Sequence, residues 1–243
     1  MPAEYGEIAA PTRIADAVEC LWWQRTAEDS PVVHRVPPDG CTDILFSSGP
    51  AGATLQAVGA MTLWRDFVLP AKELLVGIRF RPGMSAARFG GPADRMTDRL
   101  VPLDQFWGAP ARHLLERMGN AGSVGECASL LVASIGDTAP RSTLQKAVAF
   151  MEARAGRVSM DEIAREAGLS PRQFRRLCLA ETGLSPKFLA RVLRFRHALT
   201  RVRAEAGDHA GLAAECGYTD QSHFIAEFRQ FCGHTPAAFL DRG

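Results

Sequence analysis

One short pattern occurs twice in the C-terminal part of this 243-residue chain. Each copy consists of a small predicted helix, a Gly-centred turn, and a second helix that mixes aromatic with basic or polar residues. The copies span 163–177 and 212–224. A helix, a short turn and a helix form the geometry that presents the second helix to the major groove of DNA. Two copies in one chain predict contacts with two successive stretches of groove.

Charge, cysteines and hydropathy narrow the class of protein further. Residues 141–243 hold 16 Lys and Arg against 11 Asp and Glu, whereas residues 1–140 hold 12 against 16. A basic half beside an acidic half suits a nucleic-acid module joined to a module that need not touch DNA, although the excess of charge is modest.

The six cysteines are dispersed without a Cys-x-x-Cys pair, which argues against a zinc ribbon or a disulfide framework. With no signal peptide and no apolar run of about 18–20 residues, we expect a cytoplasmic protein without a membrane partner.

The N-terminal part reads as short strands followed by helices, which predicts a sandwich or small barrel. The expected strands are 19–26, 32–36, 42–47, 54–58, 64–69 and 74–80, and the expected helices are 85–89, 103–107, 110–118 and 124–135. The polar, Pro- and Gly-containing segment 136–143 is the expected linker. We therefore expect an α+β chain: a β-barrel or cupin-like domain with helices over 1–135, then an all-α domain of two helix-turn-helix subdomains over 144–243.

The first copy of the pattern contains the strongest candidates for reading bases. Ser170 and Gln173 form a capping box that begins its second helix, and Phe174, Leu177 and Cys178 must face inward. The remaining polar positions crowd guanidinium groups on one exposed face, namely Arg172, Gln173, Arg175 and Arg176. Like charges so placed repel one another, while guanidinium pairs well with guanine edges or phosphate. The alternative is a solvated basic face.

The second copy has weaker candidates. Its inward stripe is Phe224, Phe228 and Phe231, which leaves Gln221, Ser222 and His223 for base contacts. Basic residues on the long helix between the copies and on the second helix of the second copy are candidates for phosphate contacts, namely Lys187, Arg191, Arg194 and Arg229. For these residues, the alternative that they are ordinary solvated polar residues is stronger than it is for the first copy.

Residues 144–243 resemble the DNA-binding domain of the AraC/XylS family of transcriptional regulators. The resemblance rests on both turn motifs and on the closing stretch from Phe228 to Phe239. It implies a seven-helix unit of two helix-turn-helix subdomains, joined by the long helix near 186–203, with both reading helices on one face of DNA. Base-reading positions carried over from the family fall on Arg172, Arg175, Arg176, Ser222 and Ala226. Many relatives have Arg at the position of Ala226, so we expect the first reading helix to supply most of the discrimination.

Residues 1–135 more loosely resemble the N-terminal domain of a subset of these regulators. The resemblance rests on the stretches 37–46, 76–83 and 101–104, followed by Trp107. In the family such domains are often cupin-like barrels that sense a small molecule, dimerise, or both. The resemblance does not identify a ligand.

Aromatic residues on the expected strands are candidates for an effector pocket, namely Trp22, Trp23, Phe46, Trp64, Phe67 and Phe80. The alternative, that they form the core of the β domain, is at least as strong. Metal or redox sensing through His34, Asp39, Cys41 and Asp43 is a weaker hypothesis, because the His-x-His pattern of metal-binding cupins is missing. We expect a buried, inert Cys41 and no metal or other cofactor.

The leading hypothesis is a transcription regulator that binds double-stranded DNA under the control of a small-molecule effector. We expect no catalytic residues. The alternative is a DNA-binding module fused to a cupin-type enzyme, or to a Cys-based repair or redox sensor domain. Further expected partners are a second copy of the chain, through apolar faces of 110–118 and 124–135, and RNA polymerase if the protein is an activator. Packing of these two helices onto their own barrel is an equal alternative.

Overall fold

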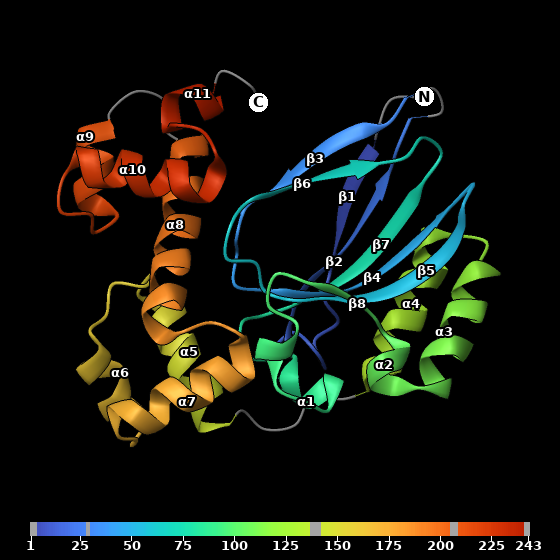
Figure 1. Ribbon diagram of the computed structural model, residues 1–243, viewed down its shortest axis with the longest axis horizontal. Helices are drawn as coiled ribbons and strands as arrows, with labels where there is room; N and C mark the ends of the chain where they lie inside the picture. The colour runs from blue at the N-terminus through green and yellow to red at the C-terminus, as the bar shows by residue number, and fades with distance from the viewer. Residues whose placement is uncertain (1–3, 28–29, 137–141, 205–208, 241–243) are drawn as a thin grey trace.

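A computed structural model describes residues 4–27, 30–136, 142–204 and 209–240. A sheet domain is followed by a domain built from helices, as the sequence predicts (Figure 1). The described strands are β1 (Glu4–Ala9), β2 (Val18–Arg25), β3 (Val32–Val36), β4 (Thr42–Gly49), β5 (Gly52–Val58), β6 (Arg65–Leu69), β7 (Leu74–Phe80) and β8 (Leu100–Pro102). Six of them form an antiparallel sheet in the order β1-β2-β7-β4-β5-β8, and β3 pairs with β6 in a separate antiparallel ribbon.

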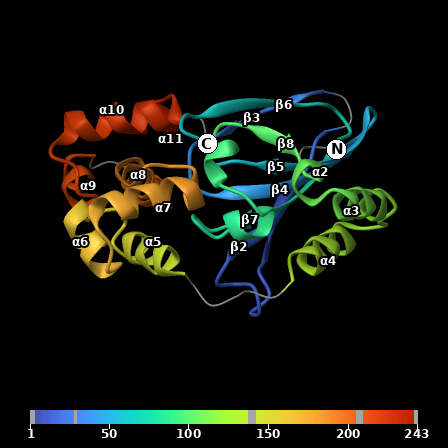
Figure 2. The same ribbon diagram turned by 60° about the horizontal axis from the view of Figure 1, so that its bottom comes forward.

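The two faces of the six-stranded sheet bury different kinds of residue, because successive side chains of a strand point to opposite sides. Large apolar side chains such as Leu21, Phe46 and Phe80 occupy one face, where they form the core of the domain. Helices α3 (Ala109–Gly119) and α4 (Val124–Ile135) cover this face, as Figure 2 shows. The apolar sides of these helices pack onto their own sheet, which is one of the two arrangements that the sequence left open. The opposite face of the sheet lies beneath the β3–β6 ribbon.

Three short helical segments also belong to the sheet domain. Helix α1 (Ala86–Phe89) and the 3-10 turn η1 (Ala93–Arg95) lie between β7 and β8, and α2 (Asp104–Trp107) follows β8. The helical domain then comprises α5 (Thr143–Ala153), α6 (Met160–Glu166), α7 (Pro171–Thr182), α8 (Pro186–Ala204), α9 (His209–Glu215), α10 (Gln221–Cys232) and α11 (Pro236–Leu240). Among the described helices, none is long and apolar enough to cross a membrane.

Helix α8 belongs to both halves of the helical domain. Leu189 and Leu193 pack with α5, α6 and α7, whereas Phe195 and Val202 pack with α9, α10 and α11. The first half of the helix therefore completes one small core and the second half completes another. A single uninterrupted helix fixes the position of one core relative to the other.

Most of the expected elements are present with ends that differ by one or two residues. The sequence did not predict β1 or β8. Strand β1 lies at the edge of the sheet and is largely exposed, so it lacks the alternation of apolar and polar residues that identifies a half-buried strand. Strand β8 has only three residues. The expected linker 136–143 lies mostly outside the described residues.

Candidate DNA-binding helices and interdomain cavity

Both expected helix-turn-helix units form, α6 with α7 and α9 with α10. The turn after α6 passes through Gly168 at φ +61°, and the turn after α9 passes through Gly217 at φ +77°. Glycine adopts this left-handed conformation at little cost. A Cβ at Gly217 would also lie 2.6 Å from the side chain of Arg157. These constraints explain why each copy of the sequence pattern centres on a glycine.

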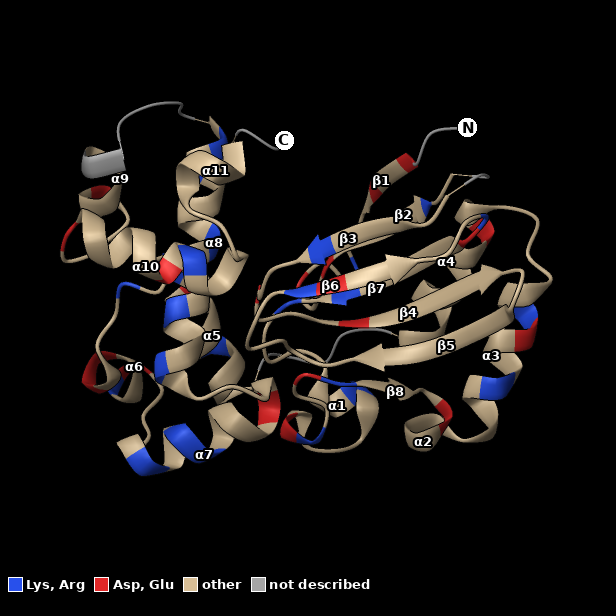
Figure 3. Ribbon diagram, turned by 45° about the horizontal axis from the view of Figure 1, so that its top comes forward, with Lys and Arg blue, Asp and Glu red and all other residues tan. Residues whose placement is uncertain are grey.

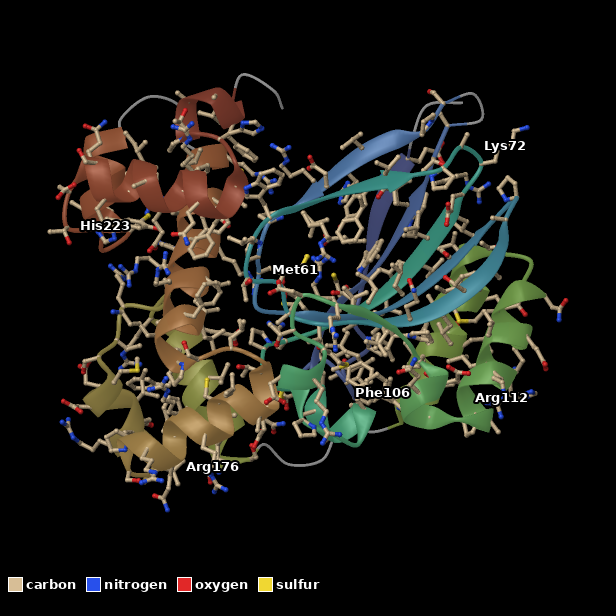
Figure 4. The ribbon with its side chains drawn as sticks, in the orientation of Figure 1. Met61, Lys72, Phe106, Arg112, Arg176 and His223 are labelled. Carbon is tan, nitrogen blue, oxygen red and sulfur yellow. The ribbon has the colours of Figure 1, made fainter. Side chains whose placement is uncertain are left out.

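The exposed face of α7 carries three arginines that have no partner among the residues that the structure describes. Ser170 and Gln173 form the expected capping box at its start: Ser170 Oγ accepts the backbone N–H of Gln173, and Gln173 Oε1 accepts the backbone N–H of Ser170. Arg172, Arg175 and Arg176 are exposed and make no hydrogen bond or ion pair within the described ranges. Figure 4 labels Arg176, whose side chain points away from the protein. The capping role occupies the side chain of Gln173, one of the expected base-reading residues.

Helix α10 presents a less charged face. Asp220 caps its start by accepting the backbone N–H of His223, and Gln221, Ser222 and Ala226 are exposed. His223 is only half-exposed: its ring lies edge-on to Tyr218 and its Nε2 is 3.9 Å from Glu227 Oε2. The structure therefore leaves Gln221 and Ser222 free on the surface, while His223 contacts the helix-turn-helix core.

The candidates for phosphate contacts fall into two groups. Lys187 and Arg229 are exposed and have no intramolecular partner in the part of the chain that the structure describes. Arg191 instead donates from Nε to Glu227 Oε2 at 2.7 Å and from Nη2 to Gln230 Oε1 at 2.6 Å. Arg194 lies over the ring of Tyr218. Arg191 and Arg194 thus connect α8 to the second helix-turn-helix unit. The sequence predicted phosphate contacts for both residues and did not predict these contacts within the protein. Figure 3 shows the lysines and arginines along α7 and α8.

Three groups of contacts hold the helical domain against the sheet domain. At the end of α7, Thr97 Oγ1 donates to the carbonyl of Gly183 at 2.8 Å, and at the start of α5, Gln145 Nε2 donates to the carbonyl of Gly83 at 3.1 Å. After α10, Arg35 Nη1 lies 2.6 Å from His234 Nε2. The third group lies between them, at the middle of α8.

That central group is formed around Arg196. Its guanidinium pairs with Glu19, donates to the carbonyl of Asp39 at 3.2 Å and lies 3.6 Å from Cys41 Sγ. Burial alone would raise the pKa of Glu19, but Arg196 and the thiol of Cys41 outweigh it and lower the pKa, so Glu19 is a carboxylate here. The pKa of Cys41 is raised well above its ordinary value by burial and by Asp39. Cys41 is a buried thiol, and this environment does not favour the reactive thiolate.

A cavity of about 500 Å³ lies between the six-stranded sheet, the β3–β6 ribbon and α8. Residues of the helical domain contribute to its wall, among them Phe195, Arg196 and Leu199. Of the expected pocket aromatics, Trp22 and Phe67 line this cavity. Phe46 and Phe80 are buried in the core on the other face of the sheet, and Trp23 packs against that core. Trp64 lies outside the cavity, beneath the guanidinium of Arg35.

The period of two along each strand explains this separation. Trp22 and Trp23 are consecutive, so their rings must lie on opposite faces. Each ring lies over a glycine of a neighbouring strand: a Cβ at Gly77 would be 2.3 Å from the ring of Trp22, and one at Gly6 would be 2.6 Å from that of Trp23. The missing side chain of Gly77 lets the indole of Trp22 lie over β7, where its Nε1 donates to Asp43 Oδ1 at 2.7 Å.

The sequence grouped four of the cavity residues, His34, Asp39, Cys41 and Asp43, as a candidate metal or redox site, but it did not predict the other polar residues of the wall. Tyr5, Glu7, Gln24, His34, Asp39, Asp43 and Arg79 all contribute to its wall. Burial, with Arg79 nearby, lowers the pKa of His34, so its imidazole is neutral at pH 7. The signal in the sequence was the single charged residue within each of two apolar strands, Asp43 in β4 and Arg79 in β7. Within the described residues, no cluster of three or more His, Cys, Asp or Glu side chains has a metal-binding arrangement.

Two family models match the chain. Residues 163–242 match a family described as a helix-turn-helix domain. The C-terminal part of the chain is an AraC-type helix-turn-helix domain. Residues 6–102 match a domain of unknown function, DUF6597. The match assigns an AraC-type DNA-binding domain to the C-terminal part of the chain, and the match to DUF6597 does not define a role for the N-terminal part. No protein of curated function matches the chain significantly.

Solved structures resemble parts or all of the chain. An AraC-type transcriptional regulator from Chromobacterium violaceum is 28% identical over 41% of this chain and 90% of its own, with a TM-score of 0.39. The DNA-binding domain of AdpA, solved with a target DNA, is 22% identical over 42% of this chain and 93% of its own, with a TM-score of 0.40. ToxT from Vibrio cholerae is 10% identical over 99% of this chain and 98% of its own, with a TM-score of 0.45.

Proposed function

We propose that this regulator reads a specific DNA sequence with α7 and α10, and that a small molecule bound in the interdomain cavity controls this reading. Arg172, Arg175 and Arg176 of α7 supply most of the base contacts, with Gln221 and Ser222 of α10 in a lesser role. Lys187 and Arg229 contact phosphates. The three α7 arginines are exposed and have no partner among the described residues. This supports the assignment, because guanidinium pairs bidentately with guanine O6 and N7.

The length of α8 suits this arrangement. A helix of 19 residues rises about 28 Å, and α7 and α10 pack against its two halves. One turn of B-DNA spans about 34 Å. The two reading helices are thus held where they can approach different stretches of one duplex. The C-terminal end of α7 contacts the sheet domain, while its N-terminal arginines remain exposed.

The observation that carries effector control is the composition of the cavity wall. Residues of the sheet domain form most of the wall, and Phe195, Arg196 and Leu199 of α8 complete it. A ligand in this space touches the helix that fixes both helix-turn-helix units. If the ligand binds the docked arrangement of the two domains with a different affinity from the undocked one, it shifts the equilibrium between these two arrangements. A regulatory ligand must have such a difference in affinity.

Fluorescence anisotropy with DNA from the upstream region of the protein's own gene, compared with scrambled DNA over a salt series, tests the reading helices. Replacing Arg172 or Arg176 with Ala should cost about 1–3 kcal/mol of preference for the specific site. Lys187→Ala should weaken binding to both DNAs equally and reduce the slope of log affinity against log salt concentration by about 0.9. Arg112→Ala, on the exposed surface of α3 in the sheet domain, is the matched control. Equal losses on both DNAs for the α7 variants would contradict base reading.

A cavity-filling variant tests the control. Val58 lines the cavity, whereas Val33 is 63% exposed on the outer side of the ribbon. Val58→Phe should change the affinity for specific DNA by about fivefold or more, the lower end of typical coupling between sites. Val33→Phe adds the same volume outside and should leave the affinity unchanged. If folded Val58→Phe protein binds DNA as the wild type does, the cavity does not control DNA binding.

A further inference from the structure

The inner end of the cavity carries more carboxylates than cations. Asp39 Oδ2 and Asp43 Oδ1 lie 3.6 and 3.4 Å from Arg79 Nε, and the guanidinium of Arg196 also lies against Asp39. Glu7 lines the wall as well and accepts a hydrogen bond from Tyr5. The other cations of the wall do not restore the balance at this end. Arg196 is paired with Glu19 and Arg35 with Asp66, while Arg203 is exposed and lies over Phe239.

The charged end adjoins an aromatic surface. The indole of Trp22 lies over Gly77 with its N–H directed to Asp43. Phe67 projects from the overlying ribbon into the same cavity. The faces of such rings carry negative electrostatic potential and attract a cation within about 6 Å of the ring centre. Carboxylates and aromatic faces therefore favour the same sign of charge on a guest.

Among the described residues, the side chain of Gln24 adds an amide without a hydrogen-bond partner to this wall. Gln24 is 7% exposed and lines the cavity two residues beyond Trp22, on the same face of β2. Its side-chain amide makes no hydrogen bond to any residue that the structure describes. The amide can therefore donate to, or accept from, a polar group of a guest in the cavity. The rest of the wall is largely apolar, with Leu45, Leu75 and Leu100 among its residues.

We propose that the cavity binds an organic cation: an ammonium group beside Asp39 and Asp43, carried on an apolar body that lies along Trp22 and Phe67. This inference rests on the proposed function, because it names the chemical class of the effector. Gln24 offers a hydrogen-bonding group for a polar substituent on that body. An anionic guest fits less well, because any anion at Arg79 Nε would lie next to two carboxylates that already occupy that side of the guanidinium.

A matched series of probes tests the class of ligand. 4-Phenylbutylamine, 4-phenylbutanol and 4-phenylbutyrate share one apolar body and differ in the charge of the end group. Isothermal titration calorimetry of the full chain, with tryptophan fluorescence as a second readout, gives the three affinities. Trp22→Phe identifies the part of the fluorescence change that comes from the cavity. We expect the amine to bind at least about tenfold more tightly than the alcohol, and the acid to bind most weakly.

Substitutions locate the charge that is responsible. Asp43→Asn keeps an oxygen that can accept the bond from Trp22, and Asp39→Asn is a second, independent neutralisation. Each should reduce the preference for amine over alcohol by about tenfold while leaving the binding of the alcohol unchanged. Asp104→Asn, a carboxylate exposed on α2, is the control. Far-ultraviolet circular dichroism confirms that each variant is folded.

The outcomes separate this inference from the proposed function. Tightest binding of the amine, lost in Asp43→Asn and Asp39→Asn, supports the cation class. Tightest binding of the acid or the alcohol overturns it and leaves the cavity as an effector site. If none of the three probes binds, the cation class also fails, and the DNA affinity of Val58→Phe then decides the proposed function separately.

Discussion

Arg191 gives the sharpest prediction, because the structure assigns it a role within the protein. Its guanidinium bridges Glu227 and Gln230 across the contact between α8 and α10, and the side chain of Glu227 is only 4% exposed. Arg191→Met keeps the apolar stem and removes the charge. Glu227 is then left as a buried carboxylate without its cation, an arrangement that typically costs about 3–5 kcal/mol.

The expected loss lies at or just below the lower end of that range. Arg191 is 28% exposed, so water screens the pair in part. His223 Nε2 is 3.9 Å from the same carboxylate and can compensate when protonated. We therefore expect Arg191→Met to destabilise the helical domain by about 2–3 kcal/mol. Adding Glu227→Gln removes the uncompensated charge, so the double variant should recover about 1–2 kcal/mol of the loss.

Urea unfolding measures this effect for each domain separately. All four tryptophans, Trp22, Trp23, Trp64 and Trp107, lie in the sheet domain, so their fluorescence follows that domain. Circular dichroism at 222 nm mainly follows the helices. Arg191→Met should shift the circular dichroism transition more than the fluorescence transition.

DNA binding provides the control for the same prediction. Arg229 is exposed on α10 without a partner among the described residues, and Arg229→Met should leave stability unchanged while lowering the salt slope of DNA binding by about 0.9. Arg191→Met, measured at a temperature where it is folded, should keep the wild-type slope. If Arg191→Met unfolds at the same urea concentration as the wild type and lowers the salt slope of DNA binding, Arg191 contacts phosphate and does not stabilise the contact between α8 and α10.

Three further predictions concern the cavity, the first reading helix and the domain contact. Gly77→Ala places a methyl group where the Trp22 ring lies, so the ring must move at a cost of about 1–3 kcal/mol; a red shift of tryptophan emission reports it, and an unchanged spectrum counts against the placement. Ser170→Ala removes the cap of α7 and should lower stability by about 1 kcal/mol in a thermal melt; an unchanged Tm would show that the cap contributes nothing. Arg196→Met breaks the contact with Glu19 and should change affinity for specific DNA by about fivefold or more; equal affinities would mean that this contact does not couple the domains.

The sequence predicts the helical domain better than the cavity, and the reason is physical. Capping and turn chemistry are local, so Ser170 and Gly168 mark the ends of helices without knowledge of distant residues. The cavity depends on which face of each strand is covered. Aromatic residues at 22, 23, 46 and 80 all look alike in the sequence, and the period of two divides them between the cavity and the core only once the strand order is known.

Arg191 and Arg194 show a second limit of sequence reasoning. A basic residue on a long helix has the same appearance whether it faces phosphate or a buried acid. Only the position of Glu227, 36 residues further along the chain, distinguishes the two. Lys187 and Arg229, which have no such partner among the described residues, remain candidates for phosphate contacts.

The placement of α8 explains why control and reading can be coupled without a long pathway. Its apolar side chains divide between the two helix-turn-helix cores, while Arg196 and Leu199 on the same helix form part of the cavity wall. A guest in the cavity therefore contacts the element that fixes the separation of α7 and α10. Because packed cores tolerate little deformation, a change in how α8 docks would move each helix-turn-helix unit largely as a rigid body. Control would then require only that the guest favour one docking of α8 over another.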